Sequence, residues 1–312
     1  MPPKTALAFA PAVISNFFAV HTEALAKDPP DYWRAGATGG GFTLSKGVYT
    51  SAWLLRSSSR AVSAAVNGNA NYPADTTVRA VELLLDAARC PPHLVELVQT
   101  VEVPIKAGFG SSSASALSAV IAVAAALDLP MSKEEVAFFA HKAEIMRHTG
   151  LGTVSSTFDY SGAAVITKAG GPGVAKVQSV PVPHDLRVVT AFLSPKKKGG
   201  RLGSQRMRNK VNRLGEAALE RASDRSLESL LAAGYEFAQE LGFMTHAVRT
   251  LVALALEEGA VGASQNMLGN ALHAVVRERE VARLSSAIRA ASKFAKVDSF
   301  HIGGRTAQVL AE

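Results

Sequence analysis

Residues 103–127 read VPIKAGFGSSSASALSAVIAVAAAL, and the change of composition inside this stretch decides the fold. Gly108 and Gly110 lead into four serines within five residues, and an almost wholly apolar run follows. Glycines allow a close approach of the backbone, and the unpaired N–H groups at the start of a helix attract anions. The stretch therefore predicts a strand, a phosphate-binding loop and a buried helix, in that order.

The glycine-serine loop does not fit two well-known phosphate-loop patterns. No Gly-Lys-Ser/Thr follows at the spacing of a Walker A loop, and serine stands where a dinucleotide fingerprint needs glycine. A structural turn that caps a buried helix therefore stays open as an alternative. A serine hydroxyl can also ligate Mg²⁺, provided that a carboxylate is near. Glu144 is the candidate carboxylate, with a surface glutamate as the alternative interpretation.

Composition narrows the class of protein. The chain has 312 residues, of which 48% are hydrophobic and 19% charged, as in a folded chain of one large or two ordinary domains. The single cysteine, Cys90, excludes an internal disulfide framework and indicates a reducing cytoplasm. We expect no membrane association, because Pro11 interrupts the apolar N-terminus and the run 114–127 falls short of the about 20 residues that span a bilayer.

The net charge of +7 raises the question of nucleic acid. Much of the excess lies in residues 196–213, KKKGGRLGSQRMRNKVNR. A solvated basic surface, a site for a small anion and a strip for nucleic acid are all open interpretations. Nucleic acid is the least favoured of the three, because no aromatic side chain in the segment can stack on a base.

Hydrophobic periodicity predicts an α+β protein with two domains, residues 1–180 and 181–312. The glycine-rich segment 34–47 is expected to be a loop, and the second domain is expected to be mostly helical. Ser132 and Glu135 form a capping-box pattern at the start of the helix predicted over 131–150. The expected strands or extended segments are 5–20, 47–55, 94–105, 154–168, 176–193 and a last one near 306–310, and the expected helices are 76–88, 131–150, 205–221, 226–241, 243–258 and 275–295.

Taken together, the motifs resemble those of the GHMP kinases, whose second motif is a Pro-x3-Gly-Leu-Gly-Ser-Ser-Ala phosphate loop. Here that motif reads Pro104-Ile-Lys-Ala-Gly108-Phe-Gly110-Ser111-Ser112-Ser113-Ala114. Within the superfamily the chain looks most like the archaeal pantoate kinases. Further stretches that carry this resemblance are 8–18, 34–50, 140–154, AGGPG at 169–173 and NMLGN at 266–270. The resemblance is strong from 34 to 173 and thin after about 180.

The resemblance implies a GHMP kinase fold, with an N-terminal domain similar to ribosomal protein S5 domain 2 and a ferredoxin-like C-terminal domain. It implies transfer of the γ-phosphoryl group of ATP to the primary hydroxyl of pantoate, with Mg²⁺, on a route to coenzyme A. Ser112 and Glu144 would be metal ligands and catalytic residues. The implied ATP-binding residues are Pro104, Gly108, Gly110, Ser111, Ser112, Ser113 and Ala114, and the implied substrate-binding residues are Thr38, Gly39, His141 and Lys168. A homodimer is compatible with this family.

Two departures from the family pattern fall where chemistry is expected. Relatives usually read Thr-Gly-Leu-Gly-Asp-Val, with the aspartate as the base, whereas this chain has Thr153 at that catalytic position. The first motif usually reads Ala-Pro-Gly-His, whereas this chain ends the motif with Val13. Catalysis by positioning without a base, a substitute carboxylate such as Asp159, and a non-catalytic relative that binds ligand or RNA are the open explanations. A GHMP kinase for another hydroxy acid or alcohol is a further alternative.

Overall fold

The computed structural model describes residues 3–195 and 204–311, which form two sheets and their covering helices. The seven-stranded first sheet has the order β11-β1-β2-β4-β3, with β5 paired to β2 and β6 paired to β5. Its strands are β1 (Lys4–His21), β2 (Gly36–Arg56), β3 (Ala61–Val66), β4 (His93–Val101), β5 (Ala163–Lys168), β6 (Lys176–Val180) and β11 (Gln308–Ala311). The four-stranded second sheet has the order β10-β7-β9-β8, with β7 (Leu186–Phe192), β8 (Gly262–Gln265), β9 (Ala271–Arg277) and β10 (Lys296–His301).

The glycine-rich segment 34–47 is mostly strand, so the loop predicted there is wrong. Strand β2 pairs with β1 along almost its whole length, with irregular register at two places in β1. A Cβ atom at Gly41 would lie 2.2 Å from the carbonyl oxygen of Ile14, and one at Gly47 would lie 2.1 Å from that of Ala10. These glycines are therefore required by the close approach of two strands at bulges rather than by a turn.

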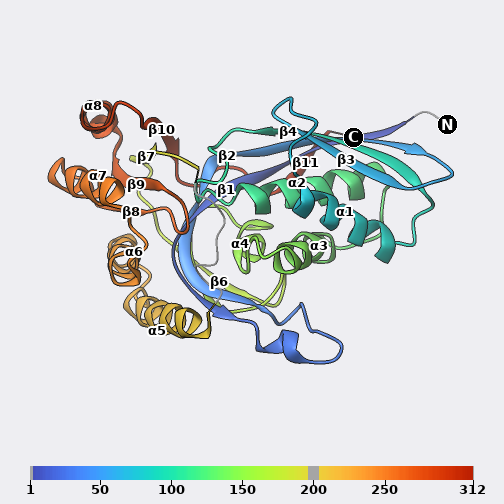
Figure 1. Cartoon of the computed structure of the whole chain (residues 1–312), viewed down its shortest axis with the longest axis horizontal. Helices are drawn as coiled ribbons and strands as arrows, with labels where there is room; N and C mark the ends of the chain where they lie inside the picture. Colours follow the sequence, from blue (N-terminus) through green and yellow to red (C-terminus); the bar gives the residue numbers. More distant parts are fainter. Residues whose placement is uncertain (1–2, 196–203, 312) are drawn as a thin grey trace.

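Four helices cover one face of the first sheet: α1 (Asp75–Ala87), α2 (Ser111–Ala126), α3 (Lys133–Met146) and α4 (Thr153–Thr157). Figure 1 shows them on the concave side of the curved strands β1 and β2. The apolar run after the serines forms α2, which is buried between the sheet, α1 and α3. The capping box of Ser132 and Glu135 is confirmed at the start of α3. The extended segment predicted from 154 is wrong for its first residues, which form α4.

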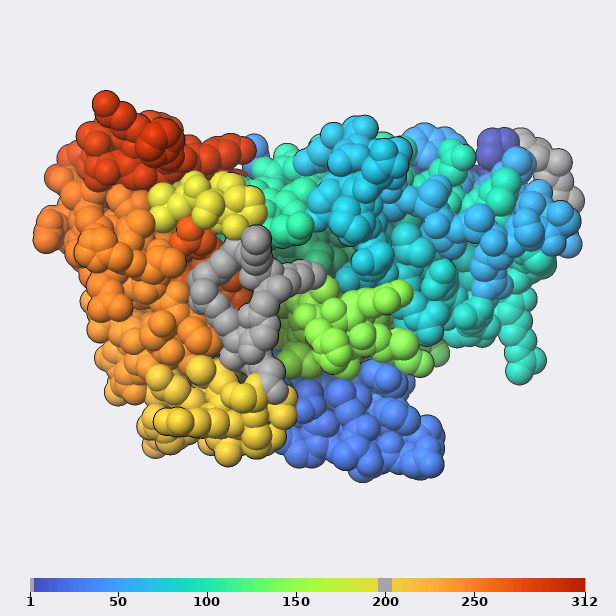
Figure 2. Space-filling view, viewed as in Figure 1, coloured from blue at the N-terminus to red at the C-terminus, as the bar shows by residue number. Residues whose placement is uncertain are grey.

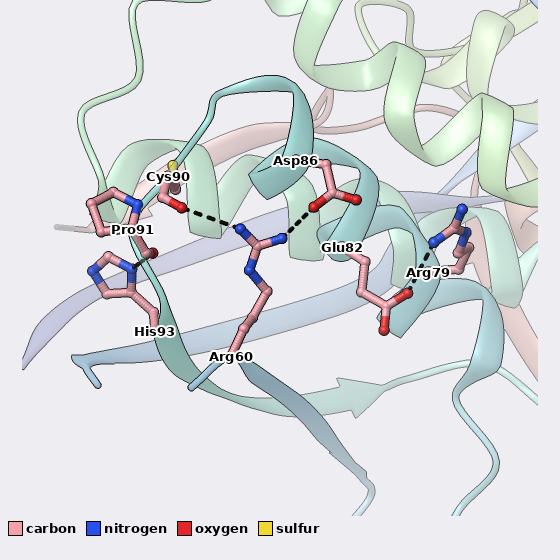
Figure 3. A network of polar contacts seen from close by, with 7 residues as sticks. All are labelled: Arg60, Arg79, Glu82, Asp86, Cys90, Pro91 and His93. Atoms are coloured by element: carbon pink, nitrogen blue, oxygen red, sulfur yellow. Dashed lines mark hydrogen bonds and ion pairs between the residues drawn. The ribbon is translucent and has the colours of Figure 1, made fainter. Parts of the chain in front are cut away.

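Strand β3, which periodicity did not predict, is tied to α1 by a polar network at the edge of the sheet. Figure 3 shows the Arg60 guanidinium between the Asp86 carboxylate and the Cys90 carbonyl, and its Nη2 atom donates to that carbonyl at 3.2 Å. The Nδ1 atom of His93 lies 2.7 Å from the Pro91 carbonyl oxygen in the same network. The end of α1 and the start of β3 are therefore held together by hydrogen bonds from one side chain.

The C-terminal half contains a sheet as well as helices α5 (Gln205–Arg221), α6 (Leu227–Leu241), α7 (His246–Glu257) and α8 (Val281–Ala291). Three of these helices match their predicted positions closely. The single helix predicted over 275–295 is partly wrong, because β9 runs to Arg277 and α8 begins at Val281. Strand β9, ALHAVVR, is largely a short buried apolar run, which periodicity alone cannot distinguish from buried helix.

The two sheets belong to opposite ends of one elongated body. The chain passes from the first sheet to the second between Val180 and Leu186, and β11 returns to pair with β1. Figure 1 and Figure 2 show α6 to α8, in orange to red, at one end of the body, and β3 and α1, in light blue to cyan, toward the other. None of the helices in the described ranges has the length and hydrophobicity needed to cross a membrane. The predicted α+β class is confirmed.

Candidate active site

The loop before α2 has the backbone geometry of an anion cradle. Gly108 and Gly110 have φ angles of +81° and +60°, a region that favours glycine. Gly110 is the N-cap of α2, and among the described residues no side chain caps the helix. No side chain at the cap therefore competes for the N–H groups of the first turn, which can bind an anion. Ser111 and Ser112, which begin this turn, are partly exposed.

This loop is anchored on both sides by buried contacts. The Val13 N–H of β1 donates to the Phe109 carbonyl at 3.1 Å. The Phe109 ring is buried against Phe300 of β10, with ring centroids 6.2 Å apart. Gly108 packs on the 266–270 segment, since a Cβ there would lie 2.9 Å from the Met267 carbonyl oxygen. The loop is thus held by β1 and by two elements of the C-terminal half.

Glu144 points from α3 to the first turn of α2. Its carboxylate is buried, and the Ser112 hydroxyl donates to its Oε1 atom at 2.8 Å. The Ser113 hydroxyl donates to its Oε2 atom. Gly150 closes over the carboxylate, because a Cβ at that position would lie 2.1 Å from Oε2. The surface-glutamate interpretation is therefore wrong, and the bond from Ser113 is a contact that sequence reasoning did not anticipate.

The oxygen atoms of this cluster fit Mg²⁺ better than a softer metal. Serine hydroxyl and carboxylate oxygens are hard ligands, and Mg²⁺ commonly takes one or two carboxylates together with substrate phosphates. Within the described residues, no group of three or more His, Cys, Asp or Glu side chains is placed to hold a metal. A metal at Glu144 would therefore depend on phosphate oxygens for much of its coordination.

Thr153 begins α4 directly beside Gly110. A Cβ built on Gly110 would lie 3.2 Å from the Thr153 Cγ2 atom and 2.5 Å from the Val13 Cγ1 atom. The two positions that depart from the family pattern therefore flank the same glycine. Asp159 is the substitute carboxylate that the sequence left open, but it is exposed and lies 3.4 Å from the Lys133 Nζ atom. Its observed contacts are those of a surface residue.

The substrate-binding residues expected from the resemblance have different surroundings. The Thr38 Oγ1 atom lies 3.0 Å from the His21 Nε2 atom, and the Thr38 side chain is buried. Gly39 packs against the backbone of β1, since a Cβ there would lie 2.4 Å from the Phe17 carbonyl oxygen. Lys168 is exposed at the end of β5, two residues after Ile166, which pairs with Gly39.

His141 supports the connection that leads into β2. Its side chain is buried, and Nε2 donates to the carbonyl groups of Tyr32 and Ala35 at 3.2 and 3.0 Å. Trp33, from the same connection, stacks on Phe138 with ring centroids 3.9 Å apart. Burial lowers the pKa of His141. In this structure His141 contacts the backbone ahead of Thr38 and Gly39 rather than an exposed surface.

His273 is a second buried histidine, and it leads to a prediction about acid stability. Burial lowers its pKa to about 3, whereas an unfolded histidine has a pKa of about 6.5. The unfolded chain therefore binds one more proton between these values, and the free energy of unfolding falls as the pH falls. We expect this group to remove about 1.4 kcal/mol between pH 7.5 and 5.5. His141 acts in the same direction.

Urea unfolding of the wild type and of His273→Leu at the two pH values measures this contribution. The wild type is expected to lose about 1.4 kcal/mol more than the variant on acidification. Equal losses in both proteins would contradict the assignment of this proton uptake to His273.

The basic segment lies partly outside the described residues, because 196–203 are not among them. The remainder opens α5, where Ser204 accepts from the Met207 N–H as a helix cap. Arg206 and Arg213 are exposed there, and Lys210 donates to the Leu241 carbonyl at 3.5 Å. This part of the segment is therefore the start of a helix with basic side chains on its exposed side.

Comparison with known proteins connects this geometry to a family. The family model described as GHMP kinases N terminal domain matches residues 75–163, which contain the loop, Glu144 and Thr153. The pantoate kinase of Methanospirillum hungatei is 27% identical over 291 residues, 88% of each chain. The pantoate kinase of Methanocaldococcus jannaschii is 25% identical over 274 residues, 86% of this chain and 92% of the relative.

Solved structures agree with the sequence relatives. A phosphotransferase related to the CoA biosynthesis pathway superposes with a TM-score of 0.83 at 25% identity, over 98% of this chain and 99% of that chain. The MDDEF complex with MVAPP, AMPPCP and magnesium superposes with a TM-score of 0.70 at 14% identity, over 99% of this chain and 100% of that chain. The predicted fold is thereby confirmed. Residues 75–163 are thus matched by a GHMP kinase N-terminal domain, the chain as a whole resembles pantoate kinases, and these relatives indicate a phosphotransferase that acts on an alcohol group.

Proposed function

We propose that the protein is an ATP- and Mg²⁺-dependent pantoate kinase of the cytoplasm that forms 4-phosphopantoate for coenzyme A synthesis. One observation carries the kinase part of this proposal. The buried Glu144 carboxylate accepts hydrogen bonds from Ser112 and Ser113, at the uncapped start of a helix that follows a glycine loop. Such a constellation suits a phosphate chain and the cation that accompanies it.

The residues of the loop take distinct roles in this proposal. The N–H groups from Gly108 to Ser113 bind the phosphate oxygens of ATP, with Pro104 and Ala114 bounding the loop. Ser112 and Glu144 hold Mg²⁺, which would neutralise charge on the phosphates during transfer. The Ser112 hydroxyl would offer an oxygen lone pair to the cation, and it could do so with its proton still directed to Glu144. Positioning and charge neutralisation supply most of the rate in such transfers.

The acceptor hydroxyl attacks without a carboxylate base in this proposal. Its oxygen forms a bond to the γ-phosphorus, the bond from that phosphorus to the bridging oxygen breaks, and ADP leaves. Because the transition state of phosphoryl transfer is loose, little negative charge has to develop on the hydroxyl before attack. The hydroxyl proton passes to solvent or to a phosphoryl oxygen. In this proposal Thr153 lies next to the reacting groups, beside Gly110, and does not remove a proton.

Pantoate is proposed as the acceptor on the strength of the relatives. The similar proteins of two methanogens are pantoate kinases, and they match over most of their lengths. Lys168 supplies an ammonium group for the pantoate carboxylate, a charge-assisted pairing. Thr38, Gly39 and the backbone that His141 holds form the neighbouring wall. Ile166 of β5 pairs with Gly39 of β2. Lys168, at the end of β5, therefore belongs to the same sheet as Thr38 and Gly39.

The proposal is tested by ADP release from MgATP with pantoate, mevalonate, homoserine or no acceptor. We expect kcat/KM for pantoate to be at least tenfold higher than kcat/KM for mevalonate or homoserine. Formation of 4-phosphopantoate is checked by mass spectrometry. Turnover with a different acceptor would keep the kinase and overturn the substrate.

A non-catalytic ligand- or RNA-binding function is the second candidate, and the pair Val13 and Thr153 favours it. These residues place methyl groups around Gly110 where relatives have a histidine and an aspartate. Bound ATP with no turnover for any acceptor would support this candidate. An RNA complex that weakens steeply with salt would identify nucleic acid as its ligand.

A further inference from the structure

A chain of buried polar groups connects β9 to the phosphate loop. The His273 Nδ1 atom lies 3.0 Å from the Asn266 Oδ1 atom, and the Asn266 Nδ2 atom donates to the Ala107 carbonyl at 3.4 Å. The three residues are fully buried. His273 lies in the second sheet, Asn266 in the 266–270 segment and Ala107 in the phosphate loop. Asn266 and Ala107 are 159 residues apart in the sequence. The chain therefore joins the two halves of the protein at the loop.

The direction of each hydrogen bond in this chain is fixed by chemistry. A carbonyl oxygen can only accept, so the nitrogen of the Asn266 amide must face Ala107. The amide oxygen then faces His273, which must donate from Nδ1. Burial keeps His273 neutral, with a single ring proton, and that proton is the one on Nδ1. Within the described residues, Nε2 has no hydrogen-bond partner, as expected for the unprotonated nitrogen in an apolar setting.

The far end of the chain sets the orientation of a peptide group. In a trans peptide the C=O and the following N–H point in opposite directions. The carbonyl of Ala107 points toward Asn266, so the N–H of Gly108 points away from the 266–270 segment. The packing is close, because a Cβ at Gly269 would lie 2.1 Å from the Ala107 oxygen. Gly108 itself has a positive φ angle, so its peptide groups need external support to hold one orientation.

We propose that His273 is a positioning residue for the phosphate loop: through Asn266 it fixes the 107–108 peptide and directs the Gly108 N–H toward a phosphate oxygen of ATP. This inference rests on the proposed function. Without the donor at position 273, the Asn266 amide can rotate by half a turn. Its oxygen would then face the Ala107 carbonyl, and the two acceptors would repel each other. The peptide would lose its fixed orientation, although no residue that touches ATP had changed.

Three variants test this role. His273→Leu removes the donor, His273→Asn keeps a nitrogen donor near the place of Nδ1, and Asn266→Leu breaks the chain in its middle. Dissociation constants for MgATP and for adenosine are measured by calorimetry, together with kcat, the KM for the acceptor and the melting temperature. Adenosine lacks phosphate, so it reports damage to the rest of the nucleotide site separately from loss of the Gly108 contact.

The expected result is a loss that depends on phosphate. His273→Leu and Asn266→Leu should weaken MgATP binding about tenfold, the effect of one hydrogen bond to a charged group. Adenosine binding and the acceptor KM should stay unchanged, and His273→Asn should recover MgATP binding to within about threefold of the wild type.

Two results would overturn the inference. One is a folded His273→Leu or Asn266→Leu protein that binds MgATP like the wild type, and either variant alone suffices for this comparison. The other is an equal loss for MgATP and adenosine, which would indicate general damage to the fold. Failure of the proposed function is a separate outcome, because it shows in the wild type itself, as absence of pantoate turnover or of MgATP binding, before any variant is compared.

Discussion

Glu144→Gln is expected to lower kcat about 10²- to 10³-fold, the effect of removing one strong electrostatic contact to the transferred group. The substitution keeps the volume of the side chain and removes its charge. Ser112 and Ser113 both donate to this carboxylate, so an amide satisfies one hydroxyl and presents a donor to the other. The charge that would hold Mg²⁺ is lost at a buried position, where water does not replace it.

The dependence on magnesium distinguishes this role from a structural one. The concentration of Mg²⁺ at half-maximal rate should rise at least about tenfold in Glu144→Gln, because one ligand has lost its charge. The control is Glu135→Gln, the same chemical change on the same helix. Glu135 completes the capping box of α3 through an oxygen that glutamine also has, so its variant should match the wild type. Glu144→Gln with more than half of the wild-type kcat would contradict the metal role.

The sequence alone predicted the parts of the site that are local. The loop from Gly108 to Ser113 and its helix follow each other in the chain, and glycine and serine chemistry indicate their purpose. Glu144 was predicted from its place in an otherwise apolar helix segment, and α3 does bring it to Ser112. Helix α5 was predicted with its observed bounds, because its apolar residues recur at helical spacing between polar ones.

Contacts between segments that are distant in the chain could not be predicted from the sequence alone. The glycines around Gly41 were expected to form a loop, because glycine is typical of turns, but here they admit the carbonyl groups of a neighbouring strand. Nothing local shows that Ile14 is that neighbour. The bond from Asn266 to Ala107 likewise depends on how the second sheet is placed against the first. A motif such as NMLGN signals that a segment is unusual, while its partner is set by tertiary packing.

Gly110→Ala should be strongly damaging, although it adds only a single methyl group to the loop. Gly110 has a φ angle of +60°, which costs other residues about 1–2 kcal/mol. The new Cβ would also lie 2.5 Å from the Val13 Cγ1 atom and 3.2 Å from the Thr153 Cγ2 atom, and overpacking of this kind typically costs about 1–3 kcal/mol. We expect the free energy of unfolding to fall by about 3 kcal/mol and MgATP to bind at least about tenfold more weakly.

Gly68→Ala is the matched control for the backbone part of this effect. Gly68 has a φ angle of +78°, and no heavy atom of the part of the chain that the structure describes lies within 4 Å of a Cβ built there. This variant should lose about 1 kcal/mol of stability and bind MgATP normally. The double variant Val13→Ala and Gly110→Ala removes the 2.5 Å contact and should recover part of both losses. If Gly110→Ala and Gly68→Ala behave alike in urea unfolding and MgATP titration, then Val13 and Thr153 do not confine the loop, and their methyl groups do not shape the site.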